Sequence, residues 1–124
     1  MRALALVLAL APLPALSDPM VSCVMEELCV AGFPCEAERL DYKFAPDDAM
    51  ASGRGTGMLF ENTPDDGAPV SYRTTARGLV VIEAFEDDGS LTRLVLRGDG
   101  LGVLTLFNGQ QKILIQAHGE CSWL

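Results

Sequence analysis

Apolar and polar side chains alternate over much of the chain after residue 38, and this period of two is typical of half-buried β-strands. In segment 39–44, apolar Leu40, Tyr42 and Phe44 alternate with charged residues. Six more short segments are rich in branched or aromatic residues and end at Gly, Asp, Asn or Pro. The seven predicted strands are 39–44, 56–61, 70–75, 79–85, 91–97, 101–107 and 110–117.

Short turn sequences join these strands, so consecutive strands are expected to pair in antiparallel fashion. Asp88-Gly89 joins the fourth strand to the fifth, and Asn108-Gly109 joins the last two. Asn-Gly favours a two-residue type I′ turn because both residues accept positive φ. The glycine-rich segment 52–57 is predicted to be a loop. Together these features predict an all-β fold, an antiparallel meander of about seven strands that forms a small barrel or a curved sheet.

The segment 21–30 is predicted to lie outside the sheet, as a short disulfide-tethered N-terminal segment with one or two helical turns. Three stretches in the strands, 79–82, 94–96 and 113–115, are apolar on both faces, which is typical of strands buried on two sides. Something is therefore expected to cover the second face. The N-terminal segment, a second copy of the chain in a homo-oligomer, and an apolar ligand are the alternatives.

The first residues have the three parts of a secretory signal peptide. A positive start precedes the apolar run 3–11, Pro12 and Pro14 follow it, and small residues precede the end at Ser17. The apolar run is too short for a membrane span, which needs about 20 residues. A signal peptide is therefore predicted at 1–17 and a single β-rich domain at 18–124, in the periplasm or secreted, with no integral membrane segment.

The four cysteines, Cys23, Cys29, Cys35 and Cys121, all lie in the predicted domain, and an even number in a small exported domain indicates disulfides. Of the three possible pairings, Cys29–Cys35 with Cys23–Cys121 is preferred, because it gives one local staple and one bridge between the chain ends. The spacing does not fit a redox motif or a zinc site. In the alternative, 20–23 resembles a lipobox and the protein is an outer-membrane lipoprotein anchored at Cys23.

Charge narrows the classes of partner. The chain of 124 residues has 17 acidic and 9 basic residues, a net charge of −8. Loss of Arg2 with the predicted signal peptide leaves 8 basic residues against 17 acidic ones, a net charge of −9. Binding to nucleic acid depends on Lys and Arg, so no nucleic-acid partner is expected. The acidic surface favours solubility.

Candidate catalytic chemistry is sparse. His118 is the only histidine, and it could join Ser71 or Ser90 in a Ser-His-Asp arrangement, although neither serine lies in a nucleophile-elbow sequence. The acidic pairs do not have the ligand spacing of a calcium loop and are predicted to be turn residues. These pairs are 47–48, 65–66 and 87–88. No catalytic, metal-binding or cofactor-binding residue is therefore predicted, and no cofactor is expected.

The spacing Cys23-x5-Cys29-x5-Cys35, the short strands after it and the ending Gly119-Glu120-Cys121 resemble a group of small exported proteins of unknown function in alphaproteobacteria. The resemblance implies a periplasmic location and supplies no catalytic residues.

Three functions remain open from the sequence. The preferred hypothesis is a non-catalytic periplasmic binding module for a protein partner or a small apolar ligand, because the two-faced apolar strands need a cover. The alternatives are a small periplasmic enzyme that uses His118, and a protein inhibitor that presents segment 34–38. Fold class alone does not decide between them.

Overall fold

The computed structural model describes residues 19–61 and 67–124, and this part of the chain consists of strands and the connections between them. The strands are β1 (Val21–Val30), β2 (Glu36–Pro46), β3 (Arg54–Glu61), β4 (Ala68–Thr74), β5 (Val80–Phe85), β6 (Leu91–Leu96), β7 (Leu101–Phe107) and β8 (Ile113–Trp123). Neither described range contains a helix with the length and apolar character needed to cross a membrane. The predicted signal peptide at 1–17 lies outside the described residues.

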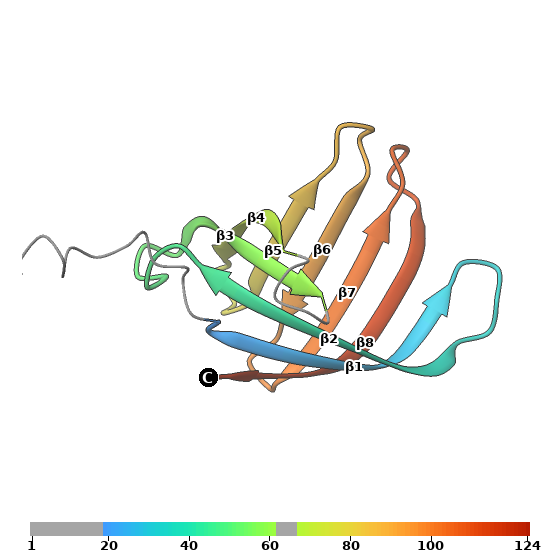
Figure 1. The fold of residues 1–124 in the computed structure, drawn as a ribbon, viewed down its shortest axis with the longest axis horizontal. Helices are drawn as coiled ribbons and strands as arrows, with labels where there is room; N and C mark the ends of the chain where they lie inside the picture. The colour runs from blue at the N-terminus through green and yellow to red at the C-terminus, as the bar shows by residue number, and fades with distance from the viewer. Residues whose placement is uncertain (1–18, 62–66) are drawn as a thin grey trace, which may run out of the picture.

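The sheet closes on itself. Each strand pairs antiparallel with the next, and β8 pairs with β1, so the eight strands form a closed barrel (Figure 1). The predicted all-β antiparallel meander is confirmed, with eight strands rather than about seven. Closure removes the two free edges that a curved sheet would leave, so the backbone N–H and C=O groups of those strands find partners.

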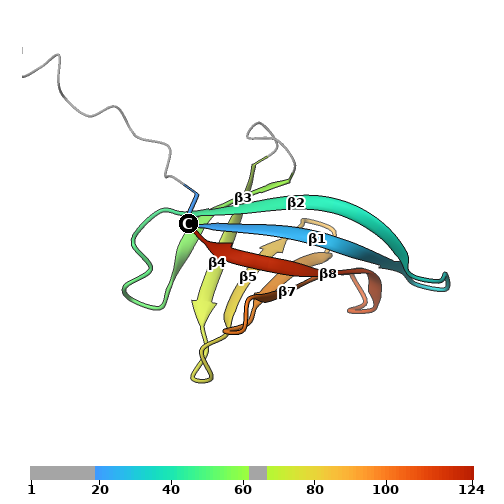
Figure 2. The same cartoon turned by 90° about the horizontal axis from the view of Figure 1, so that it is seen from below.

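The eighth strand is β1, where the prediction of helical turns in segment 21–30 is wrong. β1 lies between β2 and β8 and pairs with both (Figure 2). Both registers shift between Met25 and Glu27, a β-bulge. The bulge places Met25 and Leu28 against the same core. Two apolar residues three positions apart on one face are also the spacing of a helix, which explains the error.

Both disulfides have the preferred pairing. Cys23–Cys121 joins β1 to β8 at directly opposite positions, with the two Cα atoms 4.0 Å apart. Cys29–Cys35 closes the turn between β1 and β2. No free cysteine remains in the described part of the chain. Two structural disulfides indicate an oxidising compartment.

Four hairpin turns share one geometry, and each begins 11 residues after the one before: 75–79, 86–90, 97–101 and 108–112. In each turn the first residue's N–H donates to the fifth residue's carbonyl, and the fourth residue's N–H donates to the first residue's carbonyl. The fourth residue has positive φ in every case: Gly78, Gly89, Gly100 and Gln111. This is a three-residue loop with a left-handed residue at its end. This interval of 11 residues was not predicted from the sequence.

The two-residue turn expected at Asn108-Gly109 is wrong. Instead the Asn108 side-chain oxygen accepts hydrogen bonds from the backbone N–H groups of Gln110 and Lys112, which widens the turn. Gly109 is required for another reason, since a Cβ there would lie 2.8 Å from the carbonyl oxygen of Asp88. The turns 86–90 and 108–112 therefore lie against each other.

The barrel has two unlike ends. The closed end contains loop 47–53 and turns 75–79 and 97–101, and the open end contains turns 86–90 and 108–112 together with the β1–β2 hairpin. Figure 1 shows these last three hairpins on the side away from the C-terminus. The largest buried side chains fill the closed half: Phe44, Tyr72, Met25 and the Cys23–Cys121 bridge among them.

Glycines on the strands make room for this filling. A Cβ at Gly57 would lie 2.6 Å from the carbonyl oxygen of Ala45 and 2.9 Å from the ring of Phe44, and one at Gly55 would lie 2.8 Å from the ring of Tyr72. Segment 52–57, predicted to be a loop, is strand from Arg54 onward. Its glycines lie where large side chains approach the strand. The loop prediction is therefore wrong for residues 54–57.

The apolar second faces lie on the outside of the barrel, and no described segment of the chain covers them. Val81 is nevertheless only 5% exposed. It lies opposite Arg73 in the sheet, beside Glu83, whose carboxylate is paired with Arg73 at 3.7 Å and with Arg93 at 2.8 Å. Aliphatic stems of such long side chains cover apolar surface, so part of the second face is shielded by charged residues.

Candidate functional site

A cavity of about 390 Å³ lies inside the barrel and reaches the open end. Its volume falls within the roughly 300–1,000 Å³ typical of small-molecule sites. Most of its wall is apolar, from side chains on six strands: Leu28, Leu40, Leu59, Val70, Leu104 and Ile115. The barrel interior therefore offers a concave apolar surface of the kind that holds small ligands.

Small inward side chains create this space. Ala68 on β4, Ala84 on β5 and Thr92 on β6 line the cavity at neighbouring positions around the barrel. In the closed half the rings of Phe44 and Tyr72 meet edge to face, with centroids 5.7 Å apart. The interior of an eight-stranded barrel is just wide enough to be filled by side chains or to hold one small ligand. Here one half is filled and the other is not.

Three glutamates, Glu38, Glu61 and Glu86, stand at the mouth of the cavity. Glu38 continues the inward positions of Leu40 and Tyr42 on β2, Glu61 follows Leu59 on β3, and Glu86 follows Ala84 at the end of β5. All three strands place these residues at the open end, where the carboxylates are exposed to solvent. The site combines an apolar interior with an acidic rim on one side.

Tyr42 and Glu61 form a polar contact in the wall of this cavity. They lie opposite each other across β2 and β3, and the Tyr42 hydroxyl donates a hydrogen bond to the Glu61 carboxylate. Burial, together with the negative charge of Glu61, raises the pKa of Tyr42 above its ordinary value of 10.0. Tyr42 therefore stays protonated at neutral pH and serves as a donor that orients Glu61.

Loop 47–53 closes the opposite end. The Tyr72 hydroxyl donates to the Asp48 carboxylate at 2.6 Å, and the Thr56 hydroxyl donates to Asp47 at 2.6 Å. The hydrogen bond from Tyr72, together with one from the backbone N–H of Met50, lowers the pKa of Asp48. The Met50 side chain packs on the core below. These contacts hold the loop as the floor of the barrel.

Apolar side chains are exposed around the open end. Phe33, at the tip of the hairpin closed by Cys29–Cys35, is 72% exposed. Phe85 at the end of β5 is 71% exposed, and Ile113 at the start of β8 is also exposed. The open end of the barrel therefore carries exposed apolar side chains as well as carboxylates.

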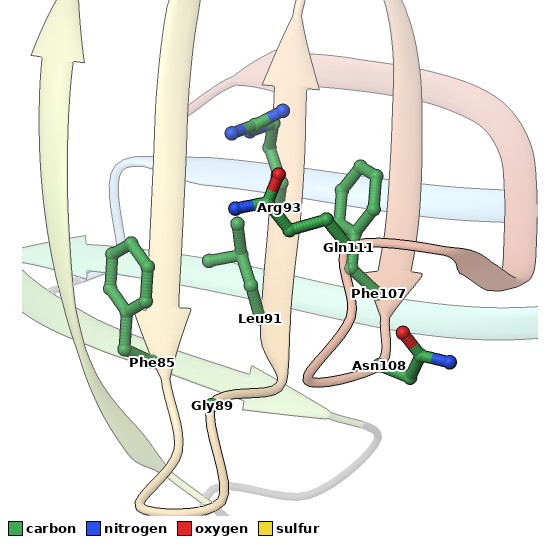
Figure 3. A pocket seen from close by; sticks show the side chains of 7 residues that line it. All are labelled: Phe85, Gly89, Leu91, Arg93, Phe107, Asn108 and Gln111. Atoms are coloured by element: carbon green, nitrogen blue, oxygen red, sulfur yellow. The ribbon is translucent and has the colours of Figure 1, made fainter.

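A second, shallower depression of about 330 Å³ lies on the outer face between the hairpins of β5–β6 and β7–β8 (Figure 3). Phe85, Leu91 and Phe107 follow one another across these strands. The Arg93 guanidinium lies 5.2 Å from the centre of the Phe107 ring, a cation–π contact, and is also paired with Glu83. The positive charge in this depression is thus already neutralised.

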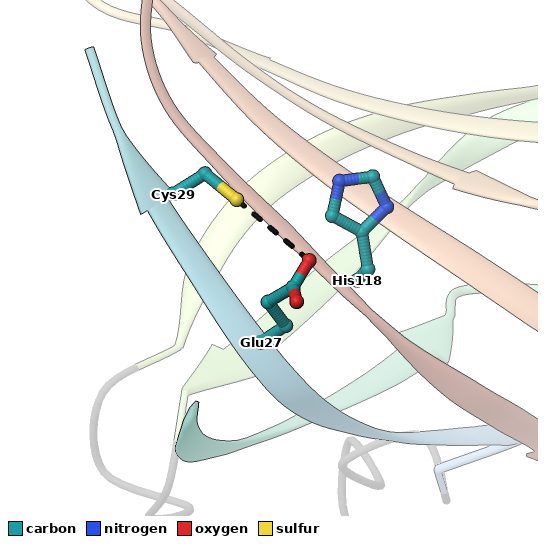
Figure 4. Close-up of side chains that lie close together, drawn as sticks. All are labelled: Glu27, Cys29 and His118. Carbon is teal, nitrogen blue, oxygen red and sulfur yellow. Dashed lines mark hydrogen bonds between the residues drawn. The ribbon is translucent and has the colours of Figure 1, made fainter. Parts of the chain in front are cut away.

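His118, the candidate catalytic base, lies on β8 opposite Glu27 of β1 (Figure 4). Glu27, Cys29 and His118 place one potential ligand atom each within 4.8 Å of one another. The Cys29 sulfur is bonded to Cys35, so it has neither a thiolate to offer a metal nor a proton to donate to Glu27, 3.8 Å away. With two ligands left, the described residues do not fit a structural zinc site, which takes four.

The serines considered with His118 do not approach it. Ser71 lies on β4, four strands away from β8 around the barrel. Ser90 lies in the β5–β6 turn, where its hydroxyl donates to Asp88 at 2.6 Å. Of the acidic pairs, 47–48 and 87–88 lie in the predicted connections, and 65–66 lies outside the described residues. The structure therefore assembles no Ser-His-Asp arrangement from these residues.

The glutamates at the mouth were not predicted from the sequence. A pattern in the sequence could have indicated them. On three strands, the alternating positions that face inward lead to a Glu at the same end of the meander. Comparison with family models, curated proteins and solved structures gave no match. The resemblance to alphaproteobacterial exported proteins therefore stays a prediction.

Proposed function

We propose that this protein is a non-catalytic binding module of the periplasm, or a secreted one, that holds a small apolar ligand inside its barrel. The observation that supports this proposal is the cavity of about 390 Å³, closed below by the side chains that fill the other half of the barrel and open at its opposite end. Burial of the apolar part of a ligand in this cavity would stabilise the complex by about 25 cal/mol for each Å² of apolar surface removed from water.

A rigid frame favours this function over a site that forms only on binding. Hydrogen-bonded strands surround the cavity on all sides, and disulfides join β1 to β8 and β1 to β2. Pre-organised sites lose little conformational entropy when a ligand binds. The inhibitor alternative is less favoured, because residues 36–38 of the nominated segment 34–38 are part of β2, and Glu36 and Ala37 pair with β1.

Two neighbouring residues on β5 offer a test. Ala84 lines the cavity, whereas Phe85 lines the outer depression. Fluorescence titration with phenylnaphthylamine, a neutral apolar fluorophore, and its displacement by decanol would measure binding. Ala84→Phe fills the cavity and should weaken binding by about tenfold or more, the effect of losing a buried apolar contact area. Phe85→Ala should leave binding unchanged.

The reverse pattern would assign the ligand to the outer depression, and absence of binding to the wild-type protein would contradict the proposal. Ala68→Leu fills the same cavity with a smaller group and guards against a folding defect in Ala84→Phe. Circular dichroism and intact mass would verify that both variants keep the β-fold and both disulfides.

A further inference from the structure

We propose that the ligand is a cationic amphiphile, an amine on an apolar chain, whose positive group lies among Glu38, Glu61 and Glu86. This proposal rests on the proposed binding function and names the chemical class that the cavity selects. The described residues that line the cavity include these three carboxylates and no Lys, Arg or His. An apolar ligand with a positive head complements that wall, whereas an anionic one is repelled by it.

The three mouth glutamates form no ion pair in the described part of the chain, in contrast to Glu83 and Asp99. On the outer face Glu83 is paired with both Arg73 and Arg93, and at the closed end Asp99 is paired with Arg97. No ion pair to Glu38, Glu61 or Glu86 occurs within residues 19–61 and 67–124. The negative charge at the mouth is therefore left for an external cation.

The charge is confined to one side of the mouth, which gives the ligand an orientation. Glu38, Glu61 and Glu86 come from β2, β3 and the end of β5, whereas Leu106 and Ile115 line the side made by β7 and β8. If the amine of a ligand lies near the carboxylates, its apolar chain can extend along the side made by β7 and β8 and into the barrel.

Tyr42 prepares one of the carboxylates for this role. Its hydroxyl donates to Glu61 from below, within the cavity, and so directs that side chain. A carboxylate has several acceptor sites, so Glu61 can accept from Tyr42 and from an ammonium at the same time. The excess of acidic residues over the whole chain also attracts a cation to the protein.

The experiment compares three amphiphiles of equal chain length, decylamine, decanol and decanoate, as competitors of phenylnaphthylamine at pH 7 and low salt. Decylamine should displace the fluorophore at about tenfold lower concentration than decanol, because several partly exposed charge contacts add to the same apolar burial. Decanoate should be the weakest of the three. The preference should shrink at high salt, because exposed charges are screened.

Variants locate the effect. The triple variant Glu38→Gln, Glu61→Gln, Glu86→Gln should bind decylamine and decanol equally while its affinity for decanol stays within about twofold, since glutamine keeps the shape and the acceptor for Tyr42. The control variant Glu26→Gln, Glu27→Gln, Glu120→Gln removes three exposed charges outside the cavity lining and should retain the preference.

Each outcome separates this proposal from the one on which it rests. Equal displacement by decylamine and decanol in the wild-type protein overturns the cation proposal and leaves apolar binding intact. A preference that survives in the triple cavity variant, or is lost in the control variant, overturns it as well, because the cation would then be recognised elsewhere. Displacement by none of the three amphiphiles overturns the binding function itself.

Discussion

The closed and open halves of this barrel are built from the same strands but are filled in opposite ways. At the closed end, Phe44 and Tyr72 project inward and glycines such as Gly57 face them, so that side chains occupy the interior. At the open end the corresponding inward positions are occupied by Ala68 and Ala84, and the interior remains hollow. Buried side chains in the closed half therefore contribute most to stability, whereas the open half contains a cavity in place of packed side chains.

The largest effect is expected at the two disulfides, one in each half, because they close loops of very different length. Replacing Cys23 and Cys121 by Ala frees a loop closed over 98 residues and should lower the free energy of unfolding by about 5 kcal/mol, whereas the bridge of Cys29 and Cys35 spans 6 and should contribute about 2 kcal/mol. Urea unfolding of the two double variants measures both values. Equal losses, or a larger loss for the bridge of Cys29 and Cys35, would contradict loop closure as the source of the difference.

Adding volume should have opposite consequences in the two halves. Gly57→Ala places a Cβ 2.6 Å from the carbonyl oxygen of Ala45, and overpacking of this kind costs about 1–3 kcal/mol. Ala84→Phe adds a far larger group, yet it enters the cavity and should leave the unfolding midpoint unchanged or raised. Thermal unfolding followed by circular dichroism compares them directly. A larger loss for Ala84→Phe than for Gly57→Ala would mean that the open half is already packed.

Acid should loosen the closed end through Asp48. Its pKa is lowered from 3.8 in the folded protein by the hydrogen bonds from Tyr72 and Met50, so its contribution to stability is present above that value. The contribution is lost as the pH falls through the lower folded value. Tyr72→Phe removes the main donor and should make the melting temperature less sensitive to pH below about 4.

A hydroxyl in the open half serves as the control for this acid effect. Thr105→Val removes a hydroxyl that accepts from the Gln116 side chain and has no carboxylate among the described residues as its hydrogen-bond partner, so its melting temperature should fall with acid as steeply as that of the wild type. An acid dependence unchanged by Tyr72→Phe would show that loop 47–53 is held by other contacts.

The smallest effect is expected in the turns. Gln111 has φ 62° at the position that is Gly78, Gly89 or Gly100 in the other three turns of this geometry. Gln111→Gly removes the strain of a left-handed non-glycine residue and should raise the free energy of unfolding by up to about 1 kcal/mol. The greater freedom of glycine in the unfolded chain offsets part of this gain. The reciprocal change Gly100→Gln should destabilise the protein in the same assay. Destabilisation by Gln111→Gly would indicate that the Gln111 side chain makes a contact worth more than the strain.

Much of the fold could be predicted from local pattern, because alternation on strands such as β2 and the turn residues between strands are visible along the chain. The disulfide pairing was also predicted, since joining Cys23 to Cys121 connects the chain ends. β1 was missed because its bulge gives Met25 and Leu28 a helical spacing.

The cavity could not be predicted in the same way. Its existence depends on which inward side chains meet across the barrel, and this requires the register of all eight strands. Ala84 in β5 and Glu86 just after it are unremarkable taken alone. They define a site only when β2 and β3 bring Glu38 and Glu61 to the same end. The outward position of His118 likewise follows from the register of β8, not from its sequence neighbours.

The most direct measurement is a methyl NMR titration of the oxidised protein with decanol. Ligand in the open half should shift the methyl resonances of Ala68, Ala84 and Leu104, which line the cavity, and leave that of Leu96 in the closed half in place. Shifts confined to Leu91 on the outer face, or no shift at saturating decanol, would contradict a ligand-binding cavity inside the barrel.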